Sequence, residues 1–123
     1  MMRIGEARNL RSATGGLLRE LGVPEHLNGY TYLLEAVELA SADPSVLRKM
    51  TTALYPSVAR KYSTTPAASE RAIRLAIENA WLRCDPEIQR FYFGNTISPE
   101  KGKPSNSEFI TRVLSAVHQE VVS

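Results

Sequence analysis

The sequence has little of what metal-binding, redox and membrane proteins need. Its 123 residues include one cysteine, Cys84, and two histidines, His26 and His118. One cysteine cannot form an internal disulfide, and three scattered ligands do not make a structural zinc site. No apolar run approaches the roughly 18 residues that a membrane span requires. We therefore expect no metal, no cofactor and no insertion into a membrane.

The N-terminus and the acidic side chains exclude two further classes of protein. Residues 1–13 carry three arginines and no apolar signal region, so we expect a cytoplasmic protein. No clustered histidine, glycine-rich phosphate loop or nucleophile motif accompanies the carboxylates of Glu35, Glu38, Asp85 and Glu87. Since no catalytic constellation can be assembled, we expect a protein that is not an enzyme and has no catalytic residues.

Charge is close to balanced over the whole chain but not along it. The formal net charge is only +2. Residues 1–44 hold four basic and six acidic side chains, whereas residues 45–123 hold eleven and seven. A basic excess confined to one part of a chain is typical of a nucleic-acid-binding surface. Residues 45–123 are therefore where such a surface is expected.

The sequence does have helical periodicity throughout. With 43% hydrophobic and 23% charged residues, the chain has the composition of one folded domain. Apolar residues recur at intervals of three and four, the spacing of the buried face of a helix. We expect a single all-α domain over residues 14–123, preceded by a flexible N-terminal arm or linker of residues 1–13. The expected helices cover residues 14–21, 28–41, 44–54, 66–83, 86–92 and 105–121. Pro56 is expected to kink the third of these or to restart it as a separate short helix over residues 55–62.

Residues 55–81 have the layout of a helix-turn-helix. A short amphipathic helix is followed by the turn Ser63-Thr64, and Thr65 is placed to cap a long helix that has Pro66 at its first position. In such a motif the second helix lies in the major groove of DNA, with its N-terminal residues against the base edges. This segment therefore predicts a DNA-binding domain.

The outward face of the long helix carries the side chains that would read bases. They are Glu70, Arg71, Arg74 and Leu75. Arginine can donate two hydrogen bonds to guanine and a carboxylate can accept one from cytosine, so Glu70 beside Arg71 suits a site that contains CG. The alternative is an ordinary i,i+4 ion pair between Glu70 and Arg74 on a solvated face, which contributes only a few tenths of a kcal/mol. The sequence leaves both interpretations open.

A second group of residues fits the phosphate backbone. Lysine, arginine, hydroxyls and backbone N–H groups at a helix N-terminus are the usual protein contacts of phosphate. Such residues precede the long helix and recur in a later loop. For the lysines of that loop, the alternative to a phosphate contact is a side chain that is simply solvated. The group consists of Arg60, Lys61, Ser63, Thr64, Thr65, Lys101 and Lys103.

A series of short motifs also runs through the chain in a specific order. They are Gly22-Val23-Pro24, Gly29-Tyr30, Tyr32-Leu33, Glu35-Ala36, Leu54-Tyr55-Pro56, Lys61-Tyr62, Glu70-Arg71-Ala72-Ile73-Arg74, Ala76-Ile77-Glu78, Ala80-Trp81, Phe93-Gly94, Lys103-Pro104 and Asn106-Ser107-Glu108-Phe109-Ile110. By these motifs, residues 14–120 resemble the C-terminal effector domain of stage zero sporulation protein A, the sporulation response regulator of endospore-forming bacteria.

The resemblance implies a fold, a ligand and partners. The fold is all-α with six helices, and the ligand is double-stranded promoter DNA with elements of the TGTCGAA type. Transcription is activated or repressed through RNA polymerase and its sigma factor, and pairing on tandem sites implies a homodimer on DNA. By position, Glu70, Arg71 and Arg74 match the family's reading helix. The basic positions near the phosphate backbone match Arg60, Lys61, Lys101 and Lys103.

The long helix departs from the family pattern at four positions. Ala67, Ala68, Ser69 and Leu75 replace Ser, Arg, Val and His. Polar contacts are lost and, at Ser69, so is the apolar residue that usually locks a reading helix onto the preceding helix. We expect altered specificity or weaker binding, although Leu75 could pack on a thymine methyl group. The alternative function is a protein-interaction module with weakened DNA binding that modulates a full-length regulator or RNA polymerase.

A receiver domain is not expected within this sequence. The 123 residues leave no spare length for one, and the alternating strand and helix pattern of such a domain is absent. We therefore expect no control by phosphorylation within the chain. An excised effector fragment and a free-standing relative both remain compatible with the sequence.

Overall fold

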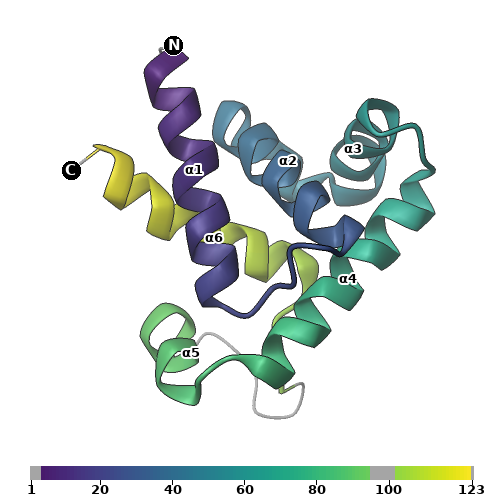
Figure 1. Ribbon diagram of the computed structural model, residues 1–123. Coiled ribbons are helices and arrows are strands. Elements are labelled where there is room, and N and C mark those ends of the chain that lie inside the picture. Colours follow the sequence, from purple (N-terminus) through teal and green to yellow (C-terminus); the bar gives the residue numbers. More distant parts are fainter. Residues whose placement is uncertain (1–3, 95–101, 123) are drawn as a thin grey trace.

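The computed structural model describes residues 4–94 and 102–122, and within these ranges all regular structure is helical (Figure 1). Two short turns lie between the second and third α-helices: the 3-10 turn η1, Pro44–Arg48, and the π-helical turn η2, Met50–Leu54. The α-helices are α1 Ile4–Glu20, α2 Asn28–Ala42, α3 Tyr55–Lys61, α4 Pro66–Arg83, α5 Pro86–Phe93 and α6 Asn106–Val122. The expected all-α fold of six helices is confirmed.

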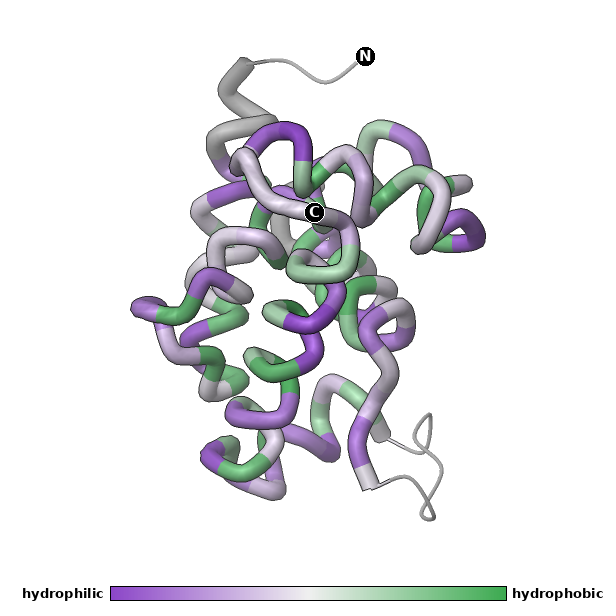
Figure 2. Tube along the Cα trace, turned by 90° about the vertical axis from the view of Figure 1, so that its right-hand side faces the viewer, coloured by the Kyte–Doolittle hydropathy of each residue, from purple (hydrophilic) through white to green (hydrophobic). Residues whose placement is uncertain are grey.

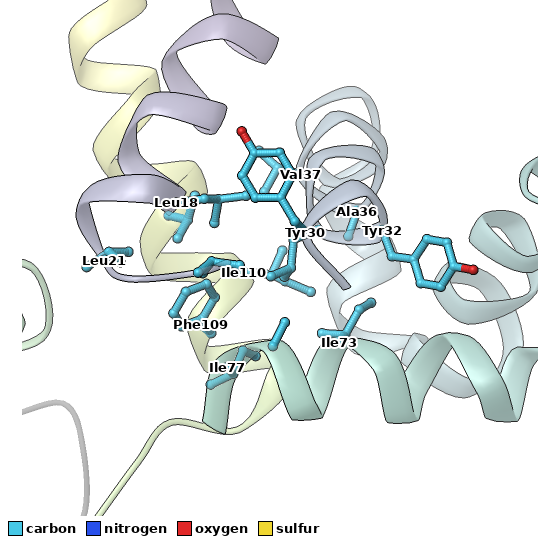
Figure 3. Packing of buried hydrophobic residues seen from close by; sticks show 14 of the residues in the cluster. Leu18, Leu21, Tyr30, Tyr32, Ala36, Val37, Ile73, Ile77, Phe109 and Ile110 are labelled. Atoms are coloured by element: carbon cyan, nitrogen blue, oxygen red, sulfur yellow. The ribbon is translucent and has the colours of Figure 1, made fainter. Parts of the chain in front are cut away.

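All six α-helices contribute side chains to one apolar core, part of which is shown in Figure 3. Apolar and polar segments alternate along the helices, so that each helix has one face to bury (Figure 2). Fully burying one large aliphatic side chain contributes about 1.5–3 kcal/mol. The fully buried side chains labelled in Figure 3 are Leu18 of α1, Leu21 directly after α1, Ala36 and Val37 of α2, Ile73 and Ile77 of α4, and Phe109 and Ile110 of α6. The core therefore holds α4 by its inner face and leaves its outer face exposed.

Local capping sets the ends of several helices. The Thr65 hydroxyl accepts a hydrogen bond from the Ala68 N–H at 3.0 Å, and α4 has the bounds expected from the sequence. At the start of α6, the Ser105 N–H donates to the Glu108 carboxylate at 2.9 Å, and the Glu108 N–H donates to the Ser105 hydroxyl at 3.1 Å. This reciprocal pair is a capping box, for which serine followed three residues later by glutamate is the sequence pattern.

The first helix is longer than the sequence predicted. It begins at Ile4 rather than Thr14, so the flexible arm predicted for residues 1–13 is wrong from residue 4 onward. Leu10 is only 2% exposed, and Arg11 forms an ion pair with Glu38 of α2. Two consecutive glycines in α1 lower its helix propensity, but these tertiary contacts outweigh that cost.

One further prediction is corrected. The continuous helix expected over residues 44–54 is interrupted at Lys49, whose φ of −129° and ψ of 47° are not helical. The adjacent β-branched Thr51 and Thr52 also favour helix formation only weakly. At the end of α5, Phe91 is 77% exposed whereas Phe93 is buried. Consecutive residues of a helix point about 100° apart, so they cannot all face one core.

Within the described residues, no helix combines the length and the apolar composition that spanning a bilayer would require.

Candidate nucleic-acid interface

Helices α3 and α4 are joined by a tight turn of defined geometry. The Tyr62 N–H donates to the Val58 carbonyl at 3.1 Å, and the Thr64 N–H donates to the Ala59 carbonyl at 2.9 Å. Ser63 has a φ of +54°, the left-handed conformation that reverses the chain after a helix and is usually occupied by glycine. The turn brings α4 across the end of α3, which is the arrangement of a helix-turn-helix (Figure 1).

Ser69 occupies the inner side of the first turns of α4. Its side chain is fully buried, in the place where a helix-turn-helix usually has an apolar residue. The Ser69 hydroxyl donates to the Thr65 carbonyl at 3.0 Å, so the buried polar group has a partner. The loss of an apolar anchor at this position therefore leaves the first turns of α4 packed on the domain.

The outer face of α4 presents the side chains that the sequence assigned to base reading. Arg71 and Arg74 are exposed, Leu75 is 42% exposed, and Glu70 is partly exposed. The Arg74 guanidinium lies 2.8 Å from the Glu70 carboxylate, so the predicted i,i+4 ion pair is present. Arg71 forms no ion pair with any residue that the structure describes. It is the cation on this face with its hydrogen-bonding capacity uncommitted.

Two of the basic residues predicted to contact phosphate are paired with carboxylates of the domain itself. Lys61 lies 2.8 Å from Glu35, which is almost fully buried in α2, and Lys103 lies 3.0 Å from Glu78 of α4. The hydrogen bond to Glu35 raises the pKa of Lys61 above its usual value. These ion pairs hold the two lysines beside α4 and partly neutralise their positive charge.

The remaining phosphate candidates lie at the turn, with one exception. Arg60 and Ser63 are exposed and Thr64 is partly exposed, beside the exposed N-cap Thr65. Arg60 takes part in no ion pair within the described part of the chain. Lys101 lies outside the described residues. The turn therefore gathers one uncommitted guanidinium and three hydroxyls at the N-terminus of α4.

Sequence reasoning missed two residues that position α4. A Cβ atom added at Gly29 of α2 would lie 2.2 Å from the Ala72 carbonyl oxygen and 2.6 Å from the Ala76 Cβ, so only glycine permits this approach of α2 to α4. The Asn106 side-chain amide of α6 donates to the Tyr55 hydroxyl of α3 and to the Glu70 carbonyl of α4. Small residues spaced four apart in α4 were the available signal for the first contact. Nothing in the local pattern indicated the second.

The part of the chain that the structure describes has no group of three histidine, cysteine, aspartate or glutamate residues that could hold a metal ion. Cys84 is a buried free thiol whose pKa is raised, first by burial and then by the nearby carboxylate of Asp85. An ionised thiolate is disfavoured there, and thiolate is the reactive form. Cys84 therefore packs as an apolar residue.

Comparison with known families agrees with this geometry. Residues 14–117 match the family described as "Sporulation initiation factor Spo0A C terminal". The match includes all of α2, α3, α4 and α5, and with them the entire helix-turn-helix. Proteins of this family contain a non-catalytic, DNA-binding domain of transcription factors that act in sporulation. The chain therefore belongs to the Spo0A C-terminal family and is a helical effector domain for DNA-binding regulation of transcription.

Proposed function

We propose that the domain reads a promoter element of the TGTCGAA type with the exposed face of α4. The observation that carries the proposal is the uncommitted guanidinium of Arg71, which projects from the second turn of the helix. Such a group can donate two hydrogen bonds to N7 and O6 of a guanine in the major groove. The exposed Ala67 and Ala68 on the preceding turn are small enough to let the backbone approach the base pairs.

The neighbours of Arg71 add acidic, basic and apolar side chains to the exposed face of α4. The Glu70 carboxylate can accept a hydrogen bond from the N4 amino group of cytosine while it remains paired with Arg74, because a carboxylate has several acceptor sites. Arg74 adds donors one turn further along α4. Leu75 is exposed enough to pack against a thymine methyl group. Together these four residues offer contacts to more than one base pair.

The phosphate backbone on each side would be held by residues at the turn and by Lys103. Arg60, Ser63, Thr64 and Thr65 lie at the N-terminus of α4, where backbone N–H groups and the helix dipole also favour an anion. Lys61 and Lys103 can share their charge with phosphate, since an ammonium group has three donors. Lys101 completes the proposed set on the basis of the family resemblance alone.

Three further elements belong to the proposal. The functional unit is the effector domain of residues 14–123, to which the structure adds the first half of α1. RNA polymerase sigma factor is the proposed protein partner, and two copies would pair on tandem DNA sites. Since its proposed ligand is the chromosome, the domain would act in the cytoplasm.

A titration against two DNA duplexes tests this function. Fluorescence anisotropy would measure the Kd of the chain for a labelled TGTCGAA duplex and for a scrambled duplex of equal length, at one stated salt concentration. We expect the TGTCGAA duplex to bind at least about tenfold more tightly, which corresponds to about 1.4 kcal/mol. Equal affinity for the two duplexes, at every salt concentration tried, would contradict sequence-specific reading.

The second candidate is a protein-interaction module, and specific exposed apolar residues favour it. Leu82, near the end of α4, is 88% exposed, and Phe91 of α5 is also largely exposed. Large exposed apolar side chains such as these can form part of a protein-binding surface. Under this alternative, the chain binds both duplexes weakly and equally, and it is retained by RNA polymerase or by a full-length regulator in a pull-down assay.

A further inference from the structure

The amide of Asn106 joins three helices at one point. Asn106 is the first residue of α6, and its side-chain nitrogen donates to the Tyr55 hydroxyl of α3 at 2.9 Å and to the Glu70 carbonyl of α4 at 3.2 Å. A side-chain amide has two N–H donors, and both are used here. The single side chain therefore connects the helix that braces the reading helix with the reading helix itself.

The segment that precedes α6 lies along the flank of α4. Lys103 contacts Glu78, and Asn106 contacts the Glu70 carbonyl, so residues 103–106 run toward the N-terminus of α4. Eight residues of helix separate Glu70 from Glu78, a distance of about 12 Å along the axis. Three residues of extended chain span about 10 Å, which is close to that distance. Contact at two points, with Pro104 buried between them, fixes residues 103–106 against α4.

The bond to the Glu70 carbonyl acts on the backbone of the reading helix. Within an α-helix that carbonyl already accepts from the N–H group four residues later, so the bond from Asn106 is an additional one. Tyr55 is 8% exposed and fixed in the core, and it provides a rigid reference point on α3. A change at Asn106 would therefore alter where Glu70 and the adjacent Arg71 lie relative to α3.

We propose that Asn106 is a positioning residue for DNA recognition, which sets the placement of the base-reading turn of α4 against α3. The proposal rests on the proposed function, in which Glu70 and Arg71 contact bases. Base reading depends strongly on geometry, because a bidentate hydrogen bond needs both donors in place. Phosphate contacts tolerate small displacements, since much of their contribution is electrostatic and independent of sequence.

Three variants separate positioning from the effects of charge and stability. Asn106→Asp keeps the size of the side chain, and its carboxylate can accept from the Tyr55 hydroxyl, but it cannot donate to the Glu70 carbonyl. Ser105→Asp introduces the same charge at the adjacent exposed residue and keeps a good N-cap. Tyr55→Phe removes the hydroxyl and leaves the Asn106 donor to Glu70 intact.

The first readout is the ratio of the Kd values for the scrambled and TGTCGAA duplexes. We expect Asn106→Asp to lower this ratio about tenfold, Tyr55→Phe to lower it less, and Ser105→Asp to weaken binding to both duplexes without changing the ratio. Thermal unfolding of each variant would show whether it is folded at the temperature of the titration. A ratio for Asn106→Asp within twofold of the parent, or an equal fall for Ser105→Asp, would overturn the proposal.

The second readout needs no DNA. Amide chemical shifts of residues 69–74 in the free protein should move in Asn106→Asp and stay in place in Ser105→Asp. Unmoved shifts in Asn106→Asp would overturn the positioning role even if the parent proves to read DNA. Moved shifts, in a chain that does not distinguish the two duplexes, would instead overturn the proposed function while the structural role of Asn106 stands.

Discussion

At the scale of single residues, carboxylates decide which cations of this domain are available to a ligand. Lys61, Arg74 and Lys103 each have a carboxylate within 3.0 Å, whereas Arg60 and Arg71 have none among the described residues. A half-exposed ion pair contributes about 1 kcal/mol or less, so such pairs restrain lysines without removing them from DNA. Arg60 lies beside the turn and Arg71 on the exposed face of α4, where a DNA ligand is proposed.

Arg60 should contribute to DNA binding independently of sequence. Since each neutralised phosphate adds about one to the slope of log K against log salt concentration, Arg60→Ala should reduce that slope by about one on both the TGTCGAA and the scrambled duplex. Arg90→Ala, an equal loss of charge on α5, is the matched control and should leave the slope unchanged. A slope for Arg60→Ala equal to that of the control would contradict the phosphate contact.

Lys61 should contribute to stability through Glu35. Lys61→Ala leaves an almost fully buried carboxylate without its partner, and we expect a loss of about 1 kcal/mol in the free energy of unfolding. The pKa of Lys61 is raised in the folded state, so its contribution is fully present below the unfolded pKa of 10.5 and is lost as pH rises through the folded pKa. Urea unfolding should therefore show a constant difference between parent and variant from about pH 6 to 9, and a smaller one above 10.5. If the stability difference between parent and variant already shrinks between pH 7 and 9, below the range in which Lys61 titrates, this linkage is contradicted.

At the scale of elements, the close contact of α2 and α4 sets how the reading helix is held. Gly29→Ala places a methyl group against the backbone of α4 and should destabilise the domain by about 1–3 kcal/mol. The control is Gly16→Ala in α1, where the nearest atom is the end of the Arg19 side chain at 3.9 Å. That substitution should be neutral or stabilise by up to about 1 kcal/mol, because alanine favours a helix more than glycine does. Equal melting temperatures for the two variants would refute the close approach.

The sequence predicted helix ends well where a capping residue sets them, and predicted contacts between helices poorly. The bounds of α4 follow from Thr65 and Pro66, and the start of α6 from Ser105 and Glu108, because capping depends on residues three or four apart. The Asn106 contacts to Tyr55 and Glu70 join residues 51 and 36 positions apart. No local pattern encodes such contacts.

The candidate site shows the same division between local and distant information. The exposed face of α4 was predictable, since the apolar period of the helix marks its buried side and hence the opposite one. The sequence also predicted the Glu70–Arg74 pair as one of two open interpretations. The partners of Lys61 and Lys103 were not predictable, because Glu35 and Glu78 are 26 and 25 residues away from them in the sequence.

At the scale of the whole molecule, the helix-turn-helix lies on the side away from the start of α1 and the end of α6 (Figure 1). Helices α1 and α6 pack on each other, and α4 packs on α2, α3 and α6. The proposed DNA-reading face is therefore unobstructed by the described ends of the chain. The first half of α1 belongs to the folded body, since Leu10 is part of the apolar core.

The role of α1 in the fold can be measured directly. Leu10→Ala removes a buried side chain, and we expect a loss of about 2–5 kcal/mol in the free energy of unfolding. The neighbouring exposed residue provides the control: Asn9→Ala should change stability by less than about 0.5 kcal/mol. If both variants unfold at the same urea concentration as the parent, residues 9 and 10 lie in a flexible arm, as the sequence alone had suggested.

The most direct test of DNA reading by α4 is a double-mutant cycle between Arg71 and the guanines of the TGTCGAA duplex. The Kd would be measured for the parent chain and for Arg71→Ala, on the natural duplex and on duplexes in which each guanine in turn is replaced by 7-deazaguanine, which lacks the N7 acceptor. Arg83→Ala, at the far end of the same helix, is the charge-matched control. We predict that one replacement costs the parent and Arg83→Ala about 1–3 kcal/mol and costs Arg71→Ala almost nothing. If Arg71→Ala weakens binding to all the duplexes equally, and every replacement costs it as much as it costs the parent, Arg71 does not read a guanine.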